Sequence, residues 1–229
     1  MSLGKTLLMT VVPPIARFVL VVLGLTWRIE VRGYGYFAAA KKTGRPIVGG
    51  GMHGRLFILT WVLSRPQYGR WRILRSPSSD GEFIDRVGGG PPLRFLTAVG
   101  SSGRDGARGF IQLVRSIRSE PEIGVGFLVD GGKRGPRGRV KPGVVQLAKK
   151  CNAWLIPASA SGAPGLVARS WDRFQVPGPF AKVAVTFGRP RLVCGDDEAV
   201  RQRFEDDLAA ITTACDRRVK LRDKTPVRA

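Results

Sequence analysis

Residues 47–63 read IVGGGMHGRLFILTWVL and pass from a β-prone run, 47–52, directly into an apolar helical stretch. The same step recurs along the chain, with further β-prone runs at residues 72–75, 95–99, 123–129, 154–160 and 182–187. Helical stretches lie between the runs, at residues 34–43, 54–63, 81–87, 105–118 and 143–151. This alternation predicts an α/β fold of one domain, with a largely parallel central sheet flanked by helices.

Two segments support this prediction in detail. The run 123–129, IGVGFLV, has no polar alternation, which is typical of a strand buried on both faces at the centre of a sheet. Near the C-terminus, apolar residues recur at steps of three and four and predict an amphipathic helix: Val200, Phe204, Leu208, Ile211, Cys215 and Val219. Asp196 and Asp197 suit the start of that helix, where negative charge is favoured.

The composition excludes some classes of protein and leaves others open. The chain has 229 residues, 43% of them hydrophobic, so it is too apolar for disorder and long enough to bury a core. It carries 38 Lys and Arg against 17 Asp and Glu, a net charge of +21, which attracts nucleic acid, an anionic bilayer or a phosphate-bearing substrate. The three cysteines lack disulfide, redox or metal spacing, which favours a reducing compartment and argues against a zinc site.

Residues 7–27, LLMTVVPPIARFVLVVLGLTW, are apolar enough to resemble a membrane span or a signal peptide. Pro13 and Pro14 are expected to break the helix, and Arg17 is costly at the centre of a bilayer. We therefore expect two short helices, hinged at the prolines, that lie in the membrane interface. Lys5, Arg17 and Arg28 would reach the phosphates, and the alternative is a helical hairpin packed on the protein's own core. On this view residues 1–30 form a membrane-associating arm and residues 31–229 the α/β domain.

His53 is the one histidine of the chain, and it stands where a β-prone run becomes a helix. In an α/β sheet that place lies at the carboxyl edge, where ligands bind. The imidazole is either a catalytic base or a partly buried group bonded to a carbonyl. Asp80 and Glu82 follow the next run, 72–75, and are the nearest carboxylates to orient the ring, although Asp80 could simply cap a helix.

Two further loops suit phosphate binding. Gly100, Ser101 and Ser102 lie between a run and a helix, where free backbone N–H groups could hold an anion, or they form an ordinary capped turn. Asp130 ends the run 123–129, and a loop rich in Gly and Pro follows it with five cations: Lys133, Arg134, Arg137, Arg139 and Lys141. Such cations fit a phosphate, or they are a solvated charge run. Residues 170–174, SWDRF, indicate mainly a structured loop, or else an apolar wall near a bilayer.

Taken in order, several motifs resemble the lysophospholipid (glycerophospholipid) acyltransferase superfamily, and most closely a bacterial branch whose members mostly lack an assigned substrate. The resemblance covers roughly residues 15–190 and rests on Met52-His53-Gly54-Arg55, Ser79-Asp80-Gly81-Glu82, Gly100-Ser101-Ser102, Asp130-Gly131, Arg134-Gly135-Pro136-Arg137, Lys141-Pro142-Gly143, Ile156-Pro157 and Ser170-Trp171-Asp172-Arg173-Phe174. It implies His53 as the base of a His-x-x-x-x-Asp motif, but Ile58 stands at the usual Asp position. Asp80, or else Glu82, is then expected to replace that carboxylate. Binding of the substrate or its phosphate is expected of Arg55, Gly100, Ser101, Ser102, Asp130, Lys133, Arg134, Arg137 and Lys141.

The resemblance implies a membrane-surface O-acyltransferase at the cytoplasmic face of a bacterial inner membrane, peripheral or monotopic. It would move a fatty acyl group to a hydroxyl of a lysophospholipid or related phosphate-bearing lipid. The co-substrate would be acyl-CoA or acyl-carrier protein, with no bound cofactor and an anionic membrane surface as partner. Two alternatives are a non-catalytic lipid-binding protein of the same fold and a basic nucleic-acid-binding protein. Nucleic acid is not the expected partner, because no recognition motif accompanies the charge.

Overall fold

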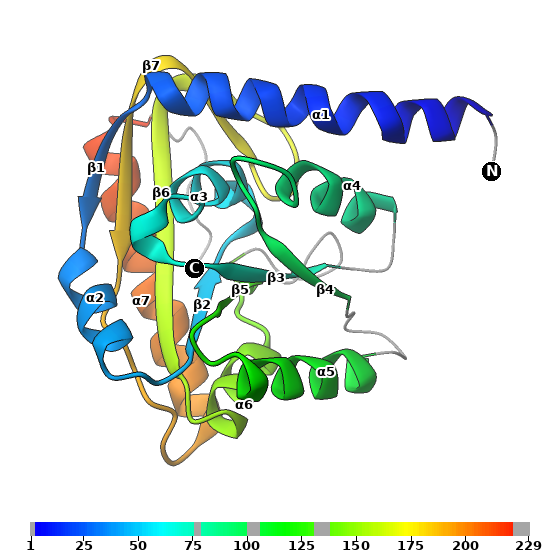
Figure 1. The fold of residues 1–229 in the computed structure, drawn as a ribbon. Helices are drawn as coiled ribbons and strands as arrows, with labels where there is room; N and C mark the ends of the chain where they lie inside the picture. Colours follow the sequence, from blue (N-terminus) through cyan, green and yellow to red (C-terminus); the bar gives the residue numbers. More distant parts are fainter. Residues whose placement is uncertain (1–2, 76–78, 100–105, 131–137, 222–229) are drawn as a thin grey trace.

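A seven-stranded sheet runs through the computed structural model of the protein, which describes residues 3–75, 79–99, 106–130 and 138–221 (Figure 1). The strand order is β1-β7-β6-β2-β5-β3-β4. The strands are β1 (Arg28–Arg32), β2 (Ile47–Gly51), β3 (Trp71–Arg75), β4 (Leu96–Val99), β5 (Gly124–Leu128), β6 (Trp154–Val167) and β7 (Gln175–Phe187). β6 and β7 pair antiparallel, and the other neighbouring strands of this sheet are parallel.

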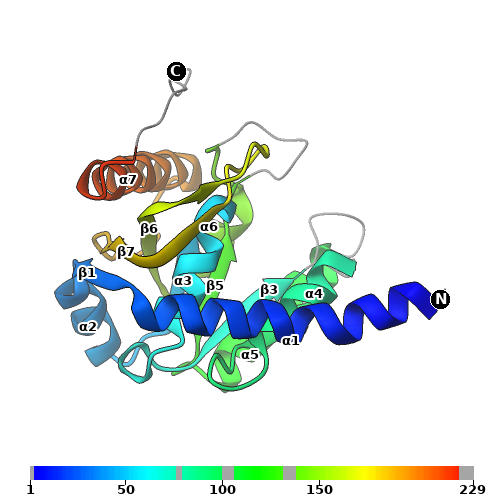
Figure 2. The same cartoon turned by 90° about the horizontal axis from the view of Figure 1, so that it is seen from above.

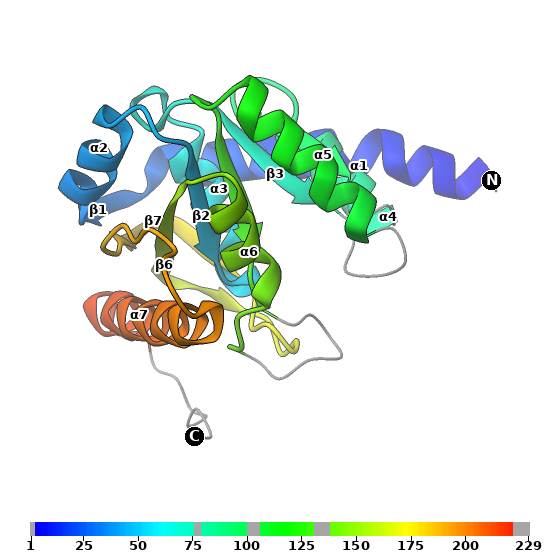
Figure 3. The same ribbon diagram turned by 90° about the horizontal axis from the view of Figure 1, so that it is seen from below.

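Helices cover both faces of the sheet. One face carries α5 (Gly106–Ser119), α6 (Pro142–Lys150) and α7 (Asp197–Arg218), which pack their apolar sides on β2, β5 and β6 (Figure 3). The other face carries α1 (Leu3–Thr26), α2 (Tyr34–Lys42), α3 (Leu56–Leu63) and α4 (Ser79–Gly88), together with the short 3-10 turns η1 (His53–Arg55) and η2 (Pro66–Tyr68). The α/β fold of one domain with an apolar N-terminal helix is therefore confirmed.

The buried elements match the sequence patterns best. β5 has the continuous burial expected of a central strand at its start, and it lies between β2 and β3. In α7, Phe204, Leu208 and Cys215 are buried as the apolar stripe predicts. The Asp196 side chain caps this helix, because it accepts a hydrogen bond of 3.0 Å from the backbone N–H of Glu198.

The edge of the sheet differs from the prediction. The strand β1 was not predicted. It pairs in parallel with β7, and its first residue, Arg28, is aligned with Lys182. β6 and β7 are also longer than predicted and form a hairpin that extends beyond the buried centre, where their residues become exposed. The proposed division of the chain at residue 30 falls inside β1 and stays a prediction.

α1 is a single helix of 24 residues that contains Pro13 and Pro14, so the prediction of two short helices was wrong. Prolines remove hydrogen bonds only locally, and contacts with the domain hold the following half of α1. Arg17 donates a hydrogen bond of 2.8 Å to the carbonyl of Val87 and a second one to that of Arg86, so it binds the C-terminal end of α4 and does not face phosphates. Gly24 lies against the Trp61 ring of α3, where an added Cβ would stand 2.3 Å from a ring atom.

Candidate active site

The register of two neighbouring strands brings His53 and Asp130 together. β2 and β5 are parallel, and Gly51 is aligned with Leu128. His53 and Asp130 each follow their aligned residue by two positions, so both leave the sheet at its carboxyl edge. This is the edge at which α/β sheets bind their ligands.

A hydrogen-bonded pair results. The Nδ1 atom of the His53 ring bonds Oδ1 of Asp130. The backbone N–H of His53 also donates to the same carboxylate, at 3.2 Å from Oδ1 and 3.3 Å from Oδ2. The Asp130 side chain is 3% exposed, whereas that of His53 is 31% exposed. A buried carboxylate that accepts from Nδ1–H leaves the lone pair of Nε2 on the outer side of the ring, and no other described side chain bonds that atom.

The segment 170–174 forms a wall beside this pair. The rings of His53 and Trp171 meet edge to face, with their centroids 5.1 Å apart. Gly54 permits the approach, since an added Cβ would stand 2.1 Å from the carbonyl oxygen of Asp172. The sequence indicated a structured loop here but not its contact with the histidine, and Gly54 directly after His53 was the available signal.

The carboxylate beside His53 is thus not one of the two that the sequence favoured. Glu82 lies on α4 and pairs with Arg86 one turn later, at 2.8 Å, with both side chains well exposed. Asp80 lies in the first turn of the same helix, but its side chain lies outside the described residues. Asp130, for which substrate binding was expected, holds the ring instead.

Arg55 is not available to bind a phosphate, which corrects the expectation for this residue. Its side chain is 8% exposed, and Nη1 lies 2.8 Å from the hydroxyl of Ser161 and 2.9 Å from Oδ1 of Asp216. Nη2 donates to Oδ2 of Asp216 at 3.0 Å, so the ion pair is bidentate. Burial raises the pKa of the neighbouring Cys215 thiol, which stays protonated and uncharged beside this pair. Arg55 therefore ties the turn η1 to β6 and α7.

Removal of this buried partner should destabilise the protein. Arg55→Met is expected to lower the free energy of unfolding by about 3 kcal/mol, because it leaves the Asp216 carboxylate without its counter-charge. Arg32→Met is the matched control, since Arg32 and Glu30 form an exposed pair whose loss should cost below about 1 kcal/mol. Urea unfolding of both variants measures the difference, and equal midpoints would show that the Arg55 pair contributes nothing.

The remaining expected binding residues divide into two groups. Lys141 is exposed and directly precedes α6, and its backbone N–H donates to the carbonyl of Val129 at 2.8 Å, next to Asp130. The others lie outside the described residues: Gly100, Ser101, Ser102, Lys133, Arg134 and Arg137. Within the described ranges, no three His, Cys, Asp or Glu side chains are grouped so that they could hold a metal ion.

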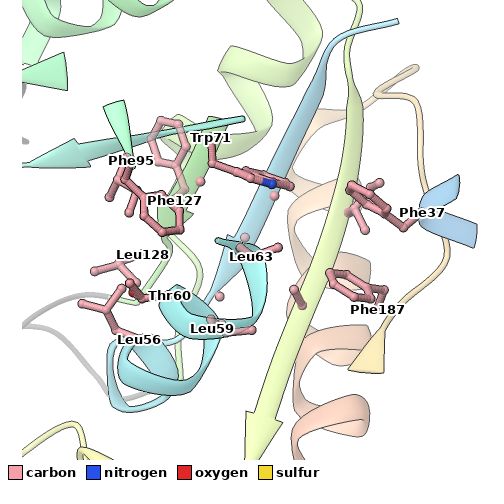
Figure 4. A pocket seen from close by; sticks show the side chains of 17 residues that line it. Phe37, Leu56, Leu59, Thr60, Leu63, Trp71, Phe95, Phe127, Leu128 and Phe187 are labelled. Carbon is pink, nitrogen blue, oxygen red and sulfur yellow. The ribbon is translucent and has the colours of Figure 1, made fainter. Parts of the chain in front are cut away.

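An apolar cavity of about 50 Å³ begins beside the pair and was not predicted (Figure 4). Gly51, two residues before His53, and Leu128, two residues before Asp130, line this cavity. Leu56, Thr60 and Leu128 lie together at one end of it. Trp71 and Phe95 lie towards the other end. Thr60 contributes a hydroxyl to walls that are otherwise hydrocarbon or aromatic. The signal in the sequence was α3 itself, LFILTWVL, which is apolar on nearly every side.

This architecture, a mostly parallel sheet flanked by helices with an apolar N-terminal helix, is similar in fold to a solved lysophospholipid acyltransferase. The crystal structure of the 1-acyl-sn-glycerophosphate (LPA) acyltransferase PlsC from Thermotoga maritima matches 92% of this chain and 81% of that chain, with a TM-score of 0.53. The two sequences are 14% identical, so the likeness establishes the fold alone.

In sequence, the chain is similar to an uncharacterized protein of Rickettsia prowazekii (strain Madrid E), with 26% identity over 140 residues. The match spans 61% of this chain and 62% of that relative. No protein-family model matches the chain.

Proposed function

We propose that the protein is an O-acyltransferase that moves a fatty acyl group from acyl-CoA or acyl-carrier protein to a hydroxyl of a lysophospholipid or related phosphate-bearing lipid. The observation that carries this proposal is the His53–Asp130 pair at the carboxyl edge of the sheet, with an apolar cavity beside it and with Nε2 free of hydrogen bonds from the described side chains. The fold shared with an LPA acyltransferase agrees with it.

In the proposed reaction His53 acts as general base and Asp130 positions it. Nε2 takes the proton of the acceptor hydroxyl while the oxygen attacks the thioester carbonyl carbon. The carbon–sulfur bond then breaks, and the proton passes from Nε2 to the departing thiolate. Asp130 keeps Nδ1 protonated and stabilises the imidazolium that forms between these steps. No covalent intermediate on the enzyme is needed, because the thioester is already activated.

The two substrates would approach the pair from different sides. The apolar cavity offers hydrocarbon walls to the first carbons of the acyl chain. For the acceptor we propose that the cations of the segment after Asp130 bind its phosphate: Lys133, Arg134, Arg137 and Lys141. The exposed position of Lys141, one backbone hydrogen bond away from Val129, supports this arrangement. The sequence segment Gly100-Ser101-Ser102 is a further phosphate contact in the proposal.

The direct test is an assay with the full-length protein. Purified protein with acyl-CoA is offered a series of lysophospholipids, and free thiol release and the mass of the lipid product are followed together. Product with at least one phosphate-bearing acceptor is the expected result. Failure with every acceptor, including a total lipid extract, for both acyl-CoA and acyl-carrier protein would favour a non-catalytic lipid-binding protein of the same fold.

We also propose that α1 lies in the plane of a membrane surface. Met9–Thr26 is long and apolar enough to cross a bilayer, yet the helix lies along α3, α4 and β7 (Figures 1 and 2). A helix held flat on its domain presents one side to a bilayer parallel to its axis. That side is apolar and exposed, with Phe18 at 67% and Leu25 at 69%, and includes Val11, Val12, Ile15, Phe18, Val19, Val22 and Leu25.

Charges placed on this side should strongly weaken membrane binding. Phe18→Asp with Val22→Asp is expected to weaken binding to phospholipid vesicles by more than about a hundredfold, since two apolar side chains of about 1.5–3 kcal/mol each no longer enter the interface. Co-sedimentation with vesicles measures the loss. Ile111→Asp is the control, because Ile111 is exposed on α5. In Figure 1 the helix α5 lies at the bottom of the molecule, whereas α1 lies at the top. Vesicle binding that survives the double substitution would contradict the proposed orientation.

A further inference from the structure

A second cavity lies at the far end of α3 from His53. It measures about 530 Å³ and is bounded by the ends of α1 and α3, by η2 and by the segment 91–95. His53 precedes α3 and Ser64 follows it, so the eight residues of this helix separate the two places by about 12 Å along its axis. Leu63, Trp71 and Phe95 line both this cavity and the apolar one beside the active site.

The polar wall of the second cavity is cationic. Arg65, Arg70 and Arg94 line it, and no Asp or Glu does so among the residues that the structure describes. The Arg65 guanidinium lies 5.0 Å from the centre of the Trp61 ring. None of the three arginines is in an ion pair with a described carboxylate, unlike Arg55, Arg191 and Arg201. Three guanidinium groups around one cavity, each without a carboxylate partner among the described residues, favour an anion, and guanidinium geometry suits phosphate oxygens.

The rest of the wall is mostly apolar and reaches the exposed side of α1. Leu25 and Leu63, with Pro91, Pro92 and Leu93, line the same cavity as the arginines. Leu25 is also the last residue of the exposed apolar side of α1. A ligand that fits both walls carries an anionic head and an apolar body, and it meets the cavity at the end of the surface proposed to contact a bilayer.

We propose that this cavity is a second, non-catalytic site that binds the phosphate headgroup of an anionic phospholipid. Arg65, Arg70 and Arg94 bind the phosphate, and Leu25 and the proline segment contact the glycerol and the upper part of the acyl chains. The site would anchor the C-terminal end of α1 to anionic membranes in particular. It goes beyond the proposed acyl transfer, because neither His53 nor Asp130 takes part in it.

The test compares two triple variants of the full chain on vesicles of phosphatidylcholine, alone or with added phosphatidylglycerol. Arg65→Gln, Arg70→Gln and Arg94→Gln together should reduce the preference for phosphatidylglycerol roughly a hundredfold, at about fivefold for each arginine near the membrane surface. The control variant combines Arg115→Gln, Lys150→Gln and Arg203→Gln, which removes the same charge from exposed positions on α5, α6 and α7. It should change the preference by less than about threefold, since those charges lie well beyond a Debye length of about 8 Å from the membrane.

Binding to phosphatidylcholine alone should be the same for both variants, which shows that the fold and the apolar side of α1 are intact. An equal loss of preference in both triple variants would overturn the proposal, because net charge alone would then explain it. The single variant Arg94→Gln, at an exposed position, is expected to lose about fivefold. It keeps the test decisive if the triple variant does not fold, and an unchanged preference would then contradict the site.

A last experiment distinguishes a phospholipid ligand from a soluble phosphate ligand. Glycerol phosphate and inorganic phosphate are added in excess to the phosphatidylglycerol vesicles. Neither should displace the wild-type protein, because each lacks the apolar body that Leu25 and the prolines contact. If either compound displaced the wild-type protein from the vesicles but not the triple arginine variant, the ligand would be a soluble phosphate. That result would overturn the assignment to phospholipid. The readout is vesicle binding, so it does not depend on whether acyl transfer occurs.

Discussion

His53→Gln is expected to lower the kcat of acyl transfer by about 10⁴-fold, the upper end of what loss of a general base costs. The side chain keeps a comparable size and polarity, but it has no nitrogen lone pair that could accept the hydroxyl proton. The wild-type ring is suited to that role because Asp130 bonds Nδ1 and no described side chain bonds Nε2. Steady-state rates with acyl-CoA and the best acceptor of the series measure the effect.

The same variant should bind vesicles as the wild-type protein does, since His53 lies at the sheet edge and not on the exposed side of α1. Unchanged vesicle binding with lost transfer would locate the defect in the chemistry. If His53→Gln retained the wild-type kcat, the proposed base would be wrong, and no other histidine in the chain could replace it.

Asp130→Asn is expected to lower kcat by about 10³-fold while the protein stays folded. The amide has nearly the same shape, but it carries no charge to stabilise the imidazolium and does not require the Nδ1–H tautomer. The carboxylate is buried and accepts from both the ring and the backbone N–H of His53, so its charge acts directly on the base. Rates are measured as for His53, and thermal unfolding checks that the fold is retained.

Glu82→Gln and Asp80→Asn are the matched controls for this substitution. Glu82 already pairs with Arg86 on the surface of α4, so its loss should change kcat less than about twofold. Asp80→Asn should be similarly mild if Asp130 is the positioning carboxylate. A large loss with Asp80→Asn and a small one with Asp130→Asn would restore the carboxylate that the sequence favoured.

Local sequence patterns could not predict which of these carboxylates contacts His53. Asp80 and Glu82 were favoured because they follow β3, the next strand after β2 in the chain. In the sheet, however, β5 lies between β2 and β3. Strand spacing is about 4.8 Å, so the end of β3 is roughly 10 Å from the end of β2, whereas the end of β5 is adjacent. Asp130, 77 residues after His53, therefore reaches the ring.

Arg55 is a second instance of the same limit. It belongs to the motif Met52-His53-Gly54-Arg55 that carried the resemblance, and binding of the substrate or its phosphate was expected of it. Its partners Ser161 and Asp216 lie more than a hundred residues further along the chain and become neighbours only when β6 and α7 pack beside η1. The fold thus neutralises the Arg55 guanidinium with the Asp216 carboxylate, although Arg55 lies next to the active site in the sequence.

Local patterns alone determined the α/β alternation, the buried central strand at 123–129, the amphipathic stripe of α7 and the position of His53 between strand and helix. These features depend on periodicity and on residue type within one element, which neighbouring residues specify. Tertiary structure alone decided the edge strand β1, the unbroken course of α1 over Pro13 and Pro14, and the pairing of His53 with Asp130. Each of these depends on which distant segments lie side by side, and the order of strands in a sheet is not encoded in the spacing of residues along any one of them.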